Sequence, residues 1–341
     1  MRIVFVLPGL TQTAGTRYIR EIAEGAAKAG HKVTIVSFND SYVSYPWLKP
    51  DKVEYINMDS VKTNKRLPEV VPECDLIVAT VVERIDEVFE CKASKKVFNV
   101  MLNYELLVDD EAKIAEIVRA YKMPFDGYYC SSTFLKNYMK CTYNIDCYLV
   151  NCGVNLKMFY PMEPRPPCLT EFNITILALG KTYDKRKGTK ALFEACAKLY
   201  TMGYDVNLML YGGQYREVFT NAFHYTYVYN PSDEFLNQIL NTVDVFISPS
   251  HGESCCMPVR EALAAGTPVI ATGIGDEDVT DISCARLISV DDPDGIVEAV
   301  RDVMLDRVKT DRLRKMGMIK MLDFSWYRTV IEFLRFIEGL K

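Results

Sequence analysis

Long apolar runs and a strong excess of either charge are absent from this chain. No apolar stretch approaches the roughly 20 residues that a membrane-spanning helix needs. The apolar start at residues 3–7 is too short for a signal peptide, so we interpret it as a first β-strand. The net charge of -5 at pH 7 gives no sign of the basic surface typical of nucleic-acid-binding proteins. We therefore expect a globular protein without a nucleic-acid partner.

Metal-binding and disulfide frameworks are also missing. The chain has 11 cysteines but no Cys-x-x-Cys pair, and it has only three histidines. Cys141, Cys147 and Cys152 come nearest to a cluster, yet no pair of histidines accompanies them. Without a secretory signal, such cysteines are expected to be reduced thiols in a cytoplasmic protein. We expect no structural metal.

Apolar strands alternate with helices along the whole chain, which is typical of parallel sheets covered by helices on both faces. In the front part, strands are expected at 2–7, 32–38, 53–58, 75–82, 96–102, 127–130 and 147–150, with helices at 16–29, 83–91, 110–121 and 133–141. In the back part, strands are expected at 173–179, 206–210, 225–229, 244–248, 268–271 and 286–289, with helices at 189–201, 233–242, 294–305 and 325–339. The pattern predicts two Rossmann-like domains.

A proline-rich segment separates the two halves. Four prolines lie between Pro161 and Pro167, where no apolar periodicity is present. Such a composition is typical of a linker. The predicted domains are therefore residues 1–160 and 168–324, with 161–167 as the linker between them.

The stretch His251–Pro268 is the most informative part of the chain. Glu253 and Glu261 stand eight positions apart around Pro258, which suits the start of a helix, and Gly266 suits its end. Free N–H groups at such a helix start favour an anionic ligand. Carboxylates beside an anion site need another role, and accepting hydrogen bonds from sugar hydroxyls is one. The alternative is that both are solvated charges at the loop and helix start.

A second segment, Gly180–Gly188, combines two glycines with four cations. Glycine permits close approach of a ligand and cations neutralise its charge, so this loop is suited to a diphosphate. Each charge-assisted hydrogen bond contributes roughly 1.5–3 kcal/mol. A solvated cationic loop is the alternative.

Gly15 lies just after the first predicted strand, at the start of the first helix. A glycine at a strand–helix turn can admit a phosphate at the helix N-terminus. The segment has no Gly-x-Gly-x-x-Gly, which argues against a nicotinamide dehydrogenase. A plain tight turn is the alternative for Gly15.

Together these segments resemble the motifs of the retaining glycosyltransferases of family GT4. Glu-x7-Glu followed by Ala-x-x-x-Gly-Thr-Pro-Val-Ile resembles the donor-sugar motif, and Gly180–Gly188 resembles the family's Gly-Arg…Lys-Gly element. Residues 151–161 resemble the family's passage into the linker, and residues 230–250 the helix and strand before the Glu-x7-Glu loop. The resemblance implies the GT-B fold, an α/β architecture in which two Rossmann-like domains with parallel sheets face each other across a cleft. It also implies that the terminal helix, about 325–341, crosses back to the first domain.

The resemblance assigns a role to each candidate residue. Glu253 would bind hydroxyls of the donor sugar, and Glu261 would bind the nucleotide ribose. The remaining donor-side candidates are Gly15 near the phosphate, the backbone N–H groups of Ser254, Cys255, Cys256 and Met257, and the cations Lys181, Arg186 and Lys187 on the leaving diphosphate.

Two features depart from the family pattern. Lys181 stands where arginine is usual, which keeps the charge but loses the bidentate fork, so Arg186 is a candidate to share its role. Many relatives carry a histidine where this chain has Asn103 and Glu105 around a tyrosine. Asn103, Glu105 and His251 are the acceptor-side candidates that remain.

The acidic run that begins at Asp276 superficially resembles the Asp-x-Asp of metal-dependent transferases. In a GT-B context we interpret these residues as solvated loop acids and expect no metal requirement.

The predicted function is retaining transfer of a sugar from a nucleotide-diphosphate sugar, a UDP- or GDP-sugar, to an acceptor hydroxyl, without a further cofactor. The acceptor would be a glycan, a lipid-linked sugar or a small molecule, and peripheral contact with a membrane stays open. Two other classes also stay open. One is a GT-B epimerase, which needs no acceptor, or a phosphorylase, which needs inorganic phosphate. The other is a non-catalytic nucleotide-sugar or glycan-binding protein.

Overall fold

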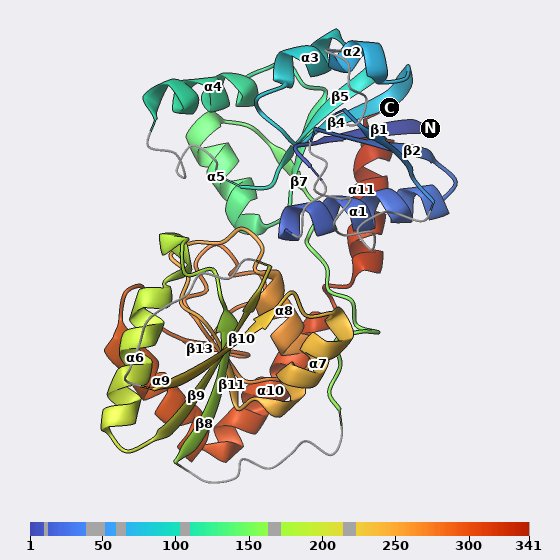
Figure 1. Cartoon of the computed structure of the whole chain (residues 1–341). Helices are drawn as coiled ribbons and strands as arrows, with labels where there is room; N and C mark the ends of the chain where they lie inside the picture. Colours follow the sequence, from blue (N-terminus) through green and yellow to red (C-terminus); the bar gives the residue numbers. More distant parts are fainter. Residues whose placement is uncertain are drawn as a thin grey trace. The chain divides into compact units, whose positions relative to one another are not determined.

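The computed structural model describes residues 1–9, 13–38, 52–58, 66–102, 110–162, 172–213 and 223–340. The chain forms two compact units (Figure 1). The N-terminal domain comprises Met1–Gly153 together with Trp326–Lys341, and the C-terminal domain comprises Val154–Ser325. The predicted α/β class with two parallel-sheet Rossmann-like domains is confirmed.

A seven-stranded parallel sheet in the order β3-β2-β1-β4-β5-β6-β7 forms the centre of the N-terminal domain. Its strands are β1 (Arg2–Leu7), β2 (Lys32–Ser37), β3 (Glu54–Asn57), β4 (Cys74–Ala79), β5 (Ala93–Val100), β6 (Gly127–Cys130) and β7 (Cys147–Leu149). Residues 3–7 of β1 are all buried, because helices cover both faces of the sheet and each alternate side chain meets a helix layer.

The helices of this domain are α1 (Ala14–Lys28), α2 (Leu67–Val70), α3 (Ile85–Glu90), α4 (Glu111–Tyr121), α5 (Thr133–Tyr143) and α11 (Trp326–Gly339). Side chains that accept hydrogen bonds from free N–H groups begin three of them: Thr13 caps α1, Asp110 caps α4 and Ser132 caps α5. Asn144 ends α5 in the left-handed conformation, with φ 55°.

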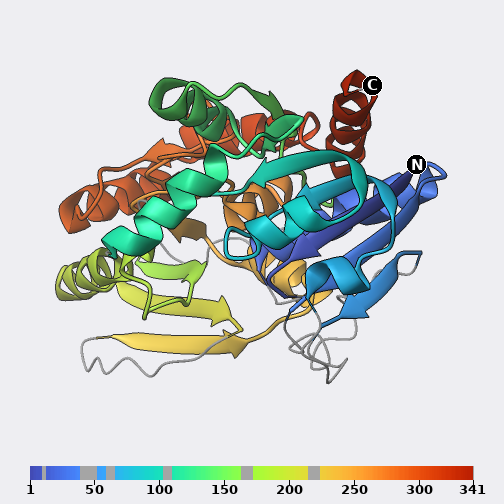
Figure 2. The same cartoon turned by 90° about the horizontal axis from the view of Figure 1, so that it is seen from above.

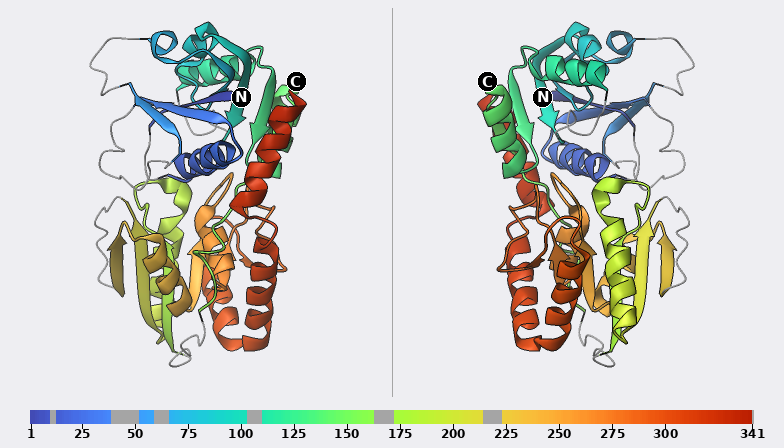
Figure 3. Two further views of the ribbon diagram at one scale, coloured as in Figure 1. Left: turned by 90° about the vertical axis from the view of Figure 1, so that its right-hand side faces the viewer. Right: turned by 90° about the vertical axis from the view of Figure 1, so that its left-hand side faces the viewer.

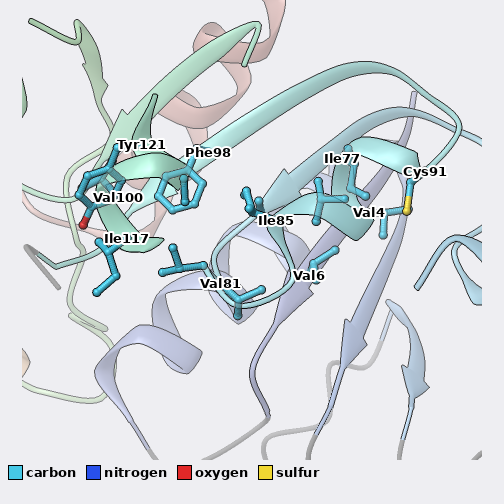
Figure 4. Close-up of a cluster of buried hydrophobic side chains, with 14 of the residues drawn as sticks. Val4, Val6, Ile77, Val81, Ile85, Cys91, Phe98, Val100, Ile117 and Tyr121 are labelled. Atoms are coloured by element: carbon cyan, nitrogen blue, oxygen red, sulfur yellow. The ribbon is translucent and has the colours of Figure 1, made fainter. Parts of the chain in front are cut away.

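Two apolar layers flank the first sheet. Val4, Val6 and Ile85 belong to the layer between the sheet and α3 and α4, part of which Figure 4 shows. On the opposite face, Phe5 packs against Phe333 of α11 with ring centroids 5.7 Å apart. The terminal helix is therefore part of the core of this domain.

α11 is held against α1 by a close backbone approach. A Cβ atom on Gly25 of α1 would lie 2.2 Å from Val330 Cγ2 of α11, so this contact requires a glycine. Hydrogen bonds fix the start of the helix: Asn151 N donates to Glu332 Oε2 over 2.7 Å, and Thr329 Oγ1 donates to the Asn151 carbonyl oxygen over 2.7 Å.

The C-terminal domain contains a six-stranded parallel sheet in the order β10-β9-β8-β11-β12-β13. Its strands are β8 (Asn173–Leu179), β9 (Asp205–Gly212), β10 (His224–Tyr229), β11 (Val245–Ser248), β12 (Val269–Ala271) and β13 (Arg286–Leu287). The edge pair β9 and β10 is yellow in Figure 2. Its helices are α6 (Thr189–Thr201), α7 (Asp233–Thr242), α8 (Met257–Ala264), α9 (Pro293–Leu305) and α10 (Arg307–Met321).

The structure differs from the sequence expectations at α10 and at the domain boundary. α10, which lies beside α9 in Figure 3, was not expected, because it buries only Leu313, Gly317 and Met321 and so lacks an apolar stripe. The first unit ends at Gly153, earlier than the predicted residue 160. Val154 and Phe159 pack into the core of the C-terminal domain, which explains the shift.

Each sheet has a point at which the strand order reverses. β1 lies between β2 and β4, and β8 lies between β9 and β11. Ligands of such sheets bind outside the carboxyl ends of the strands at this point. In the C-terminal domain, the two loops that leave β8 and β11 there are the glycine- and lysine-rich segment and the Glu253 segment. None of the helices that the structure describes combines the length and apolar composition that a membrane span requires.

Candidate functional site

The loop after β8 and the loop after β11 are joined at their backbones. His251 N donates to the Arg186 carbonyl oxygen over 2.7 Å. Gly188 has a φ of +62°, and a Cβ atom there would lie 1.9 Å from the Pro249 carbonyl oxygen. Only glycine tolerates both the left-handed backbone and this approach. The two predicted motifs therefore form one surface.

An ion pair connects the central residues of the two motifs. Lys187 Nζ lies 2.5 Å from Glu253 Oε1, and both side chains are 15% exposed. Burial acts to lower the pKa of Lys187, but the charge of Glu253 and its hydrogen bond to Lys187 outweigh burial and raise that pKa. The lysine is thus a permanent cation, and its partner is a carboxylate at the rim of the site.

Lys181 stands at the same surface without an ion-pair partner among the described residues. Burial lowers the pKa of this lysine, and the neighbouring charge of Lys187 lowers it further. A bound anion would offset both effects, since it would place a further negative charge beside Lys181.

Arg186 is engaged within its own loop. Its Nε lies 3.0 Å from Asp184 Oδ1 and its Nη2 lies 2.8 Å from Asp184 Oδ2. Asp184 also accepts a hydrogen bond from Arg186 N over 3.1 Å, which caps the short 3₁₀ turn Lys185–Lys187. The fork that was expected to share the role of Lys181 is therefore bound to a carboxylate.

A third loop, after β12, contacts the backbone of Glu253. Glu253 N donates to the Ile274 carbonyl oxygen over 2.9 Å. Gly275 has a φ of +81°, and a Cβ atom there would lie only 1.7 Å from the Glu253 carbonyl oxygen. The position of Glu253 thus depends on a glycine in a loop that the motif itself does not include.

Asp276 corrects a sequence expectation. It was interpreted as a solvated loop acid, but it is 2% exposed and forms an ion pair with Arg260 of α8, with Nη2 and Oδ1 2.6 Å apart. Arg260 is fully buried. The sequence did contain a signal for a buried partner. Arg260 and Glu261 lie inside the otherwise apolar segment Met257–Ala264, and a charged residue on a buried helix is almost always paired.

The backbone donors of the Glu253 loop are partly used by the protein itself. Cys256 N donates to Asp276 Oδ2 over 3.1 Å, and Met257 N donates to the Cys255 carbonyl oxygen over 3.1 Å. These two N–H groups are thus engaged within the protein in this structure, and their contact with the donor stays a prediction. Ser254 is buried, and Cys255 is half-buried at the start of the same turn.

Glu261 lies on α8 and is 7% exposed. It sits in the second turn of the helix, because α8 begins at Met257 and places Pro258 at its second position. Burial raises the pKa of Tyr211 at the end of β9 well above its ordinary value, and the charge of Glu261 raises it further. Glu261 therefore lies near the carboxyl end of β9.

The other candidates are more dispersed. His251 is exposed, and its Nε2 lies 2.9 Å from Asp291 Oδ1. Gly15 is the second residue of α1 in the N-terminal domain, and a Cβ atom there would lie 3.3 Å from Met101 Sδ. Its approach to a donor phosphate stays a prediction. Asn103 and Glu105 lie outside the described residues.

A small pocket lies at the carboxyl ends of β11 and β12. Its lining includes Ser248, Ser250, Glu253, Cys256, Thr272 and Asp276. Val259, Ala271 and Ile274 also line it, and its space is about that of one water molecule, so it is not by itself a sugar-sized cavity. Within the described ranges, no group of three or more His, Cys, Asp or Glu side chains is arranged to hold a metal ion.

Comparison with known proteins agrees with this geometry. Residues 173–306, which include all three loops, match the model of the family "Glycosyl transferases group 1". This match covers less than half of the chain, and it shows a likeness to that family within the C-terminal domain. The curated relatives include a phosphatidyl-myo-inositol mannosyltransferase from Mycolicibacterium smegmatis, 28% identical over 214 residues, or 58% of this chain and 52% of that protein. Another is an MMP alpha-(1->4)-mannosyltransferase from Mycolicibacterium hassiacum, 31% identical over 191 residues, or 52% of this chain and 45% of that protein. The chain spans about half the length of these relatives.

Solved structures with the GT-B fold resemble nearly the whole chain. Sucrose-phosphate synthase from Thermosynechococcus elongatus has a TM-score of 0.81 at 18% identity, with 100% of this chain and 99% of that chain covered. HepE from Anabaena, in complex with UDP and glucose, has a TM-score of 0.78 at 14% identity, with 99% and 100% covered. At these identities the likeness concerns the fold.

Proposed function

We propose that this protein transfers a sugar from a nucleotide-diphosphate sugar to an acceptor hydroxyl with retention of configuration and without a metal. The ion pair between Lys187 and Glu253 carries the proposal. It brings a cationic diphosphate loop and a carboxylate suited to sugar hydroxyls into contact at the carboxyl ends of adjacent strands.

The charges of the site fit departure of a diphosphate. As the bond between the anomeric carbon and the leaving oxygen breaks, its electron pair moves onto the diphosphate. Lys181 and Lys187 stabilise the charge that develops there, which is electrostatic catalysis. The acceptor oxygen forms the new bond to the anomeric carbon, and its proton passes to the leaving phosphate. Same-face attack follows from the family resemblance.

Binding of the diphosphate also changes the state of Glu253. In the structure this carboxylate is paired with Lys187. When Lys187 turns to the diphosphate, Glu253 becomes available to accept hydrogen bonds from the sugar. Donor binding would therefore exchange one internal ion pair for two ligand contacts.

The donor and acceptor classes come from the similar proteins. HepE was crystallised with UDP and glucose, and the curated relatives are mannosyltransferases, one of them named for phosphatidyl-myo-inositol. We therefore propose a UDP- or GDP-sugar as the donor and a glycan, lipid-linked or small-molecule acceptor. A cytoplasmic location is part of the proposal, because the cysteines that the structure describes are all free thiols.

Calorimetric titration with UDP, GDP, ADP and their sugar conjugates tests the donor site, with NAD as the control ligand. We expect one nucleoside diphosphate and its sugar conjugate to bind selectively. Binding of NAD alone, or of no nucleotide, would refute the proposal. Turnover of the donor without acceptor would indicate an epimerase, and dependence on inorganic phosphate a phosphorylase.

Two alanine variants separate the proposed roles of the carboxylates. Glu261→Ala should weaken binding of the nucleoside diphosphate and of its sugar conjugate alike. Glu253→Ala should weaken only the sugar conjugate, because its proposed contact is to the sugar and because the change releases Lys187. Equal losses of nucleoside diphosphate affinity in both variants would contradict the assignment.

A further inference from the structure

We infer that Arg260 and Asp276 are positioning residues that hold Glu253 and the start of α8 in place for the donor sugar. The inference rests on the proposed function, since it concerns how the same site discriminates a sugar conjugate from the free nucleoside diphosphate. Neither residue reaches the ligand itself, because both are buried beneath the loop that carries Glu253.

The pair is an unusual element for a domain core. Arg260 is 0% and Asp276 2% exposed, and the guanidinium carbon of Arg260 lies 5.1 Å from the ring centroid of Phe324. Removing two charges from water costs several kcal/mol per ion, so a buried pair stabilises a fold little compared with apolar residues of the same volume. Such a pair instead fixes the positions of the segments to which its two side chains are bonded.

The hydrogen bonds show which geometry it defines. One oxygen of Asp276 binds Arg260 at 2.6 Å, and the other accepts from Cys256 N at 3.1 Å. The two residues immediately before Asp276 contact Glu253: Ile274 accepts from its N–H at 2.9 Å, and Gly275 lies against its carbonyl oxygen. The segment 274–276 therefore contacts both ends of the turn Glu253–Cys256.

The turn around Asp276 is itself rigid. Asp276 N donates to the Gly273 carbonyl oxygen at 3.2 Å, and the carbonyl oxygen of Asp276 accepts from Val279 N at 3.1 Å and Thr280 N at 3.0 Å. An anchor on α8 at one side and a hydrogen-bonded turn at the other leave the Glu253 loop little freedom. Loss of the ion pair between Arg260 and Asp276 should therefore let Glu253 move away from the position in which it binds the donor sugar.

Loss of the pair between Arg260 and Asp276 should leave binding of the diphosphate nearly unchanged. Lys181 and Lys187 lie on the loop after β8, which is held by Gly188 against Pro249 and not by Asp276. Disruption of the pair should therefore reduce the preference for a sugar conjugate over the free nucleoside diphosphate. A purely structural role would instead lower both affinities together.

Asp276→Asn tests this, because it keeps the shape of the side chain and removes the charge. We expect the affinity for the free nucleoside diphosphate to stay within about 3-fold of wild type, while the affinity for the sugar conjugate falls at least roughly 10-fold and the transfer rate roughly 100-fold, as expected for a misplacement of about 1 Å. The double variant Arg260→Met/Asp276→Asn leaves no unpaired buried charge and should show the same selective loss in a folded protein.

Asp281→Asn is the matched control. Asp281 lies in the same segment, and its carboxylate contacts Lys320 at 2.6 Å and Ser283 instead of the Glu253 loop. Both affinities should stay at wild-type values in this variant. The inference is overturned, and the proposed function kept, if the wild type binds nucleotides but the ratio of the two affinities is unchanged in Asp276→Asn and in the double variant. Equal losses of both affinities in these variants would overturn it in the same way. A wild type that binds no nucleotide overturns the proposed function, and the inference with it.

Discussion

Gly275→Ala should displace Glu253 while leaving every side chain that is proposed to contact the donor chemically unchanged. A Cβ atom on Gly275 would lie 1.7 Å from the Glu253 carbonyl oxygen. Real Cβ contacts stay beyond about 3 Å, so the two segments must separate by more than about 1 Å. Alanine must also adopt the φ of +81°, which costs roughly 1–3 kcal/mol of backbone strain.

The expected loss follows from these two terms. Overpacking in a well-filled region costs about 1–3 kcal/mol, in addition to the strain. A displacement of about 1 Å at Glu253 should reduce sugar transfer about 100-fold. Urea unfolding measures the stability term, and calorimetry with the sugar conjugate and the free nucleoside diphosphate locates the functional loss at the sugar end.

Gly203→Ala provides the control for backbone strain. Gly203 lies in the same domain with a φ of +92°, and nothing lies within 4 Å of the place where its Cβ atom would be. This variant should therefore lose only the strain energy and keep wild-type donor binding. If the two alanine variants lose equal stability and both retain the sugar conjugate, the loop after β12 does not position Glu253.

The other predictions concern separate parts of the chain. Gly25→Ala should destabilise the N-terminal domain despite the better helix propensity of alanine, because its Cβ atom would lie 2.2 Å from Val330. Adding Val330→Ala should restore part of that stability in thermal unfolding; equal melting temperatures for the single and double variants would contradict the packing argument. Lys181→Met should weaken nucleoside diphosphate binding about 10–100-fold in calorimetry, the worth of one charge-assisted hydrogen bond, and an unchanged affinity would exclude Lys181 from the diphosphate site. Burial raises the pKa of Asp276 from 3.8 to about 6, against the charge and hydrogen bond of Arg260, which lower it. The stability that protonation of Asp276 contributes is present below about pH 4 and is lost as pH rises through about 6, so the loss caused by Asp276→Asn in urea unfolding should be about 2 kcal/mol smaller at pH 7 than at pH 4.5. A loss independent of pH would show that this carboxylate does not titrate there.

Much of the fold followed from local patterns. The strands of both sheets are short apolar runs between turn residues, and most helices have an apolar stripe, so their positions were predicted within a few residues. α10 was not predicted, because its buried face consists of Leu313, Gly317 and Met321 alone. Gly317 packs by the absence of a side chain, which leaves no hydrophobic signal; a Cβ atom there would lie 2.8 Å from Leu263 Cδ2.

The candidate site was predicted as two separate motifs, and its connections were not. Lys187 and Glu253 are 66 positions apart and contact each other because β8 and β11 are neighbours in the sheet. Strand order is set by how the whole domain packs, so no local window contains it. The same holds for Asp276, whose burial depends on a partner on α8, 16 positions earlier in the chain.

The sequence by itself determined the α/β class, the two-domain organisation and the residue types that suit a nucleotide sugar, because periodicity and glycine or charge placement are properties of neighbouring residues. Only the tertiary structure decided that Lys187 pairs with Glu253, that Arg186 is held by Asp184, and that Asp276 is a buried anchor instead of a solvated acid. Electrostatic environment depends on distance and burial in three dimensions, and the same carboxylate is a surface charge or a core ion according to what the fold places beside it.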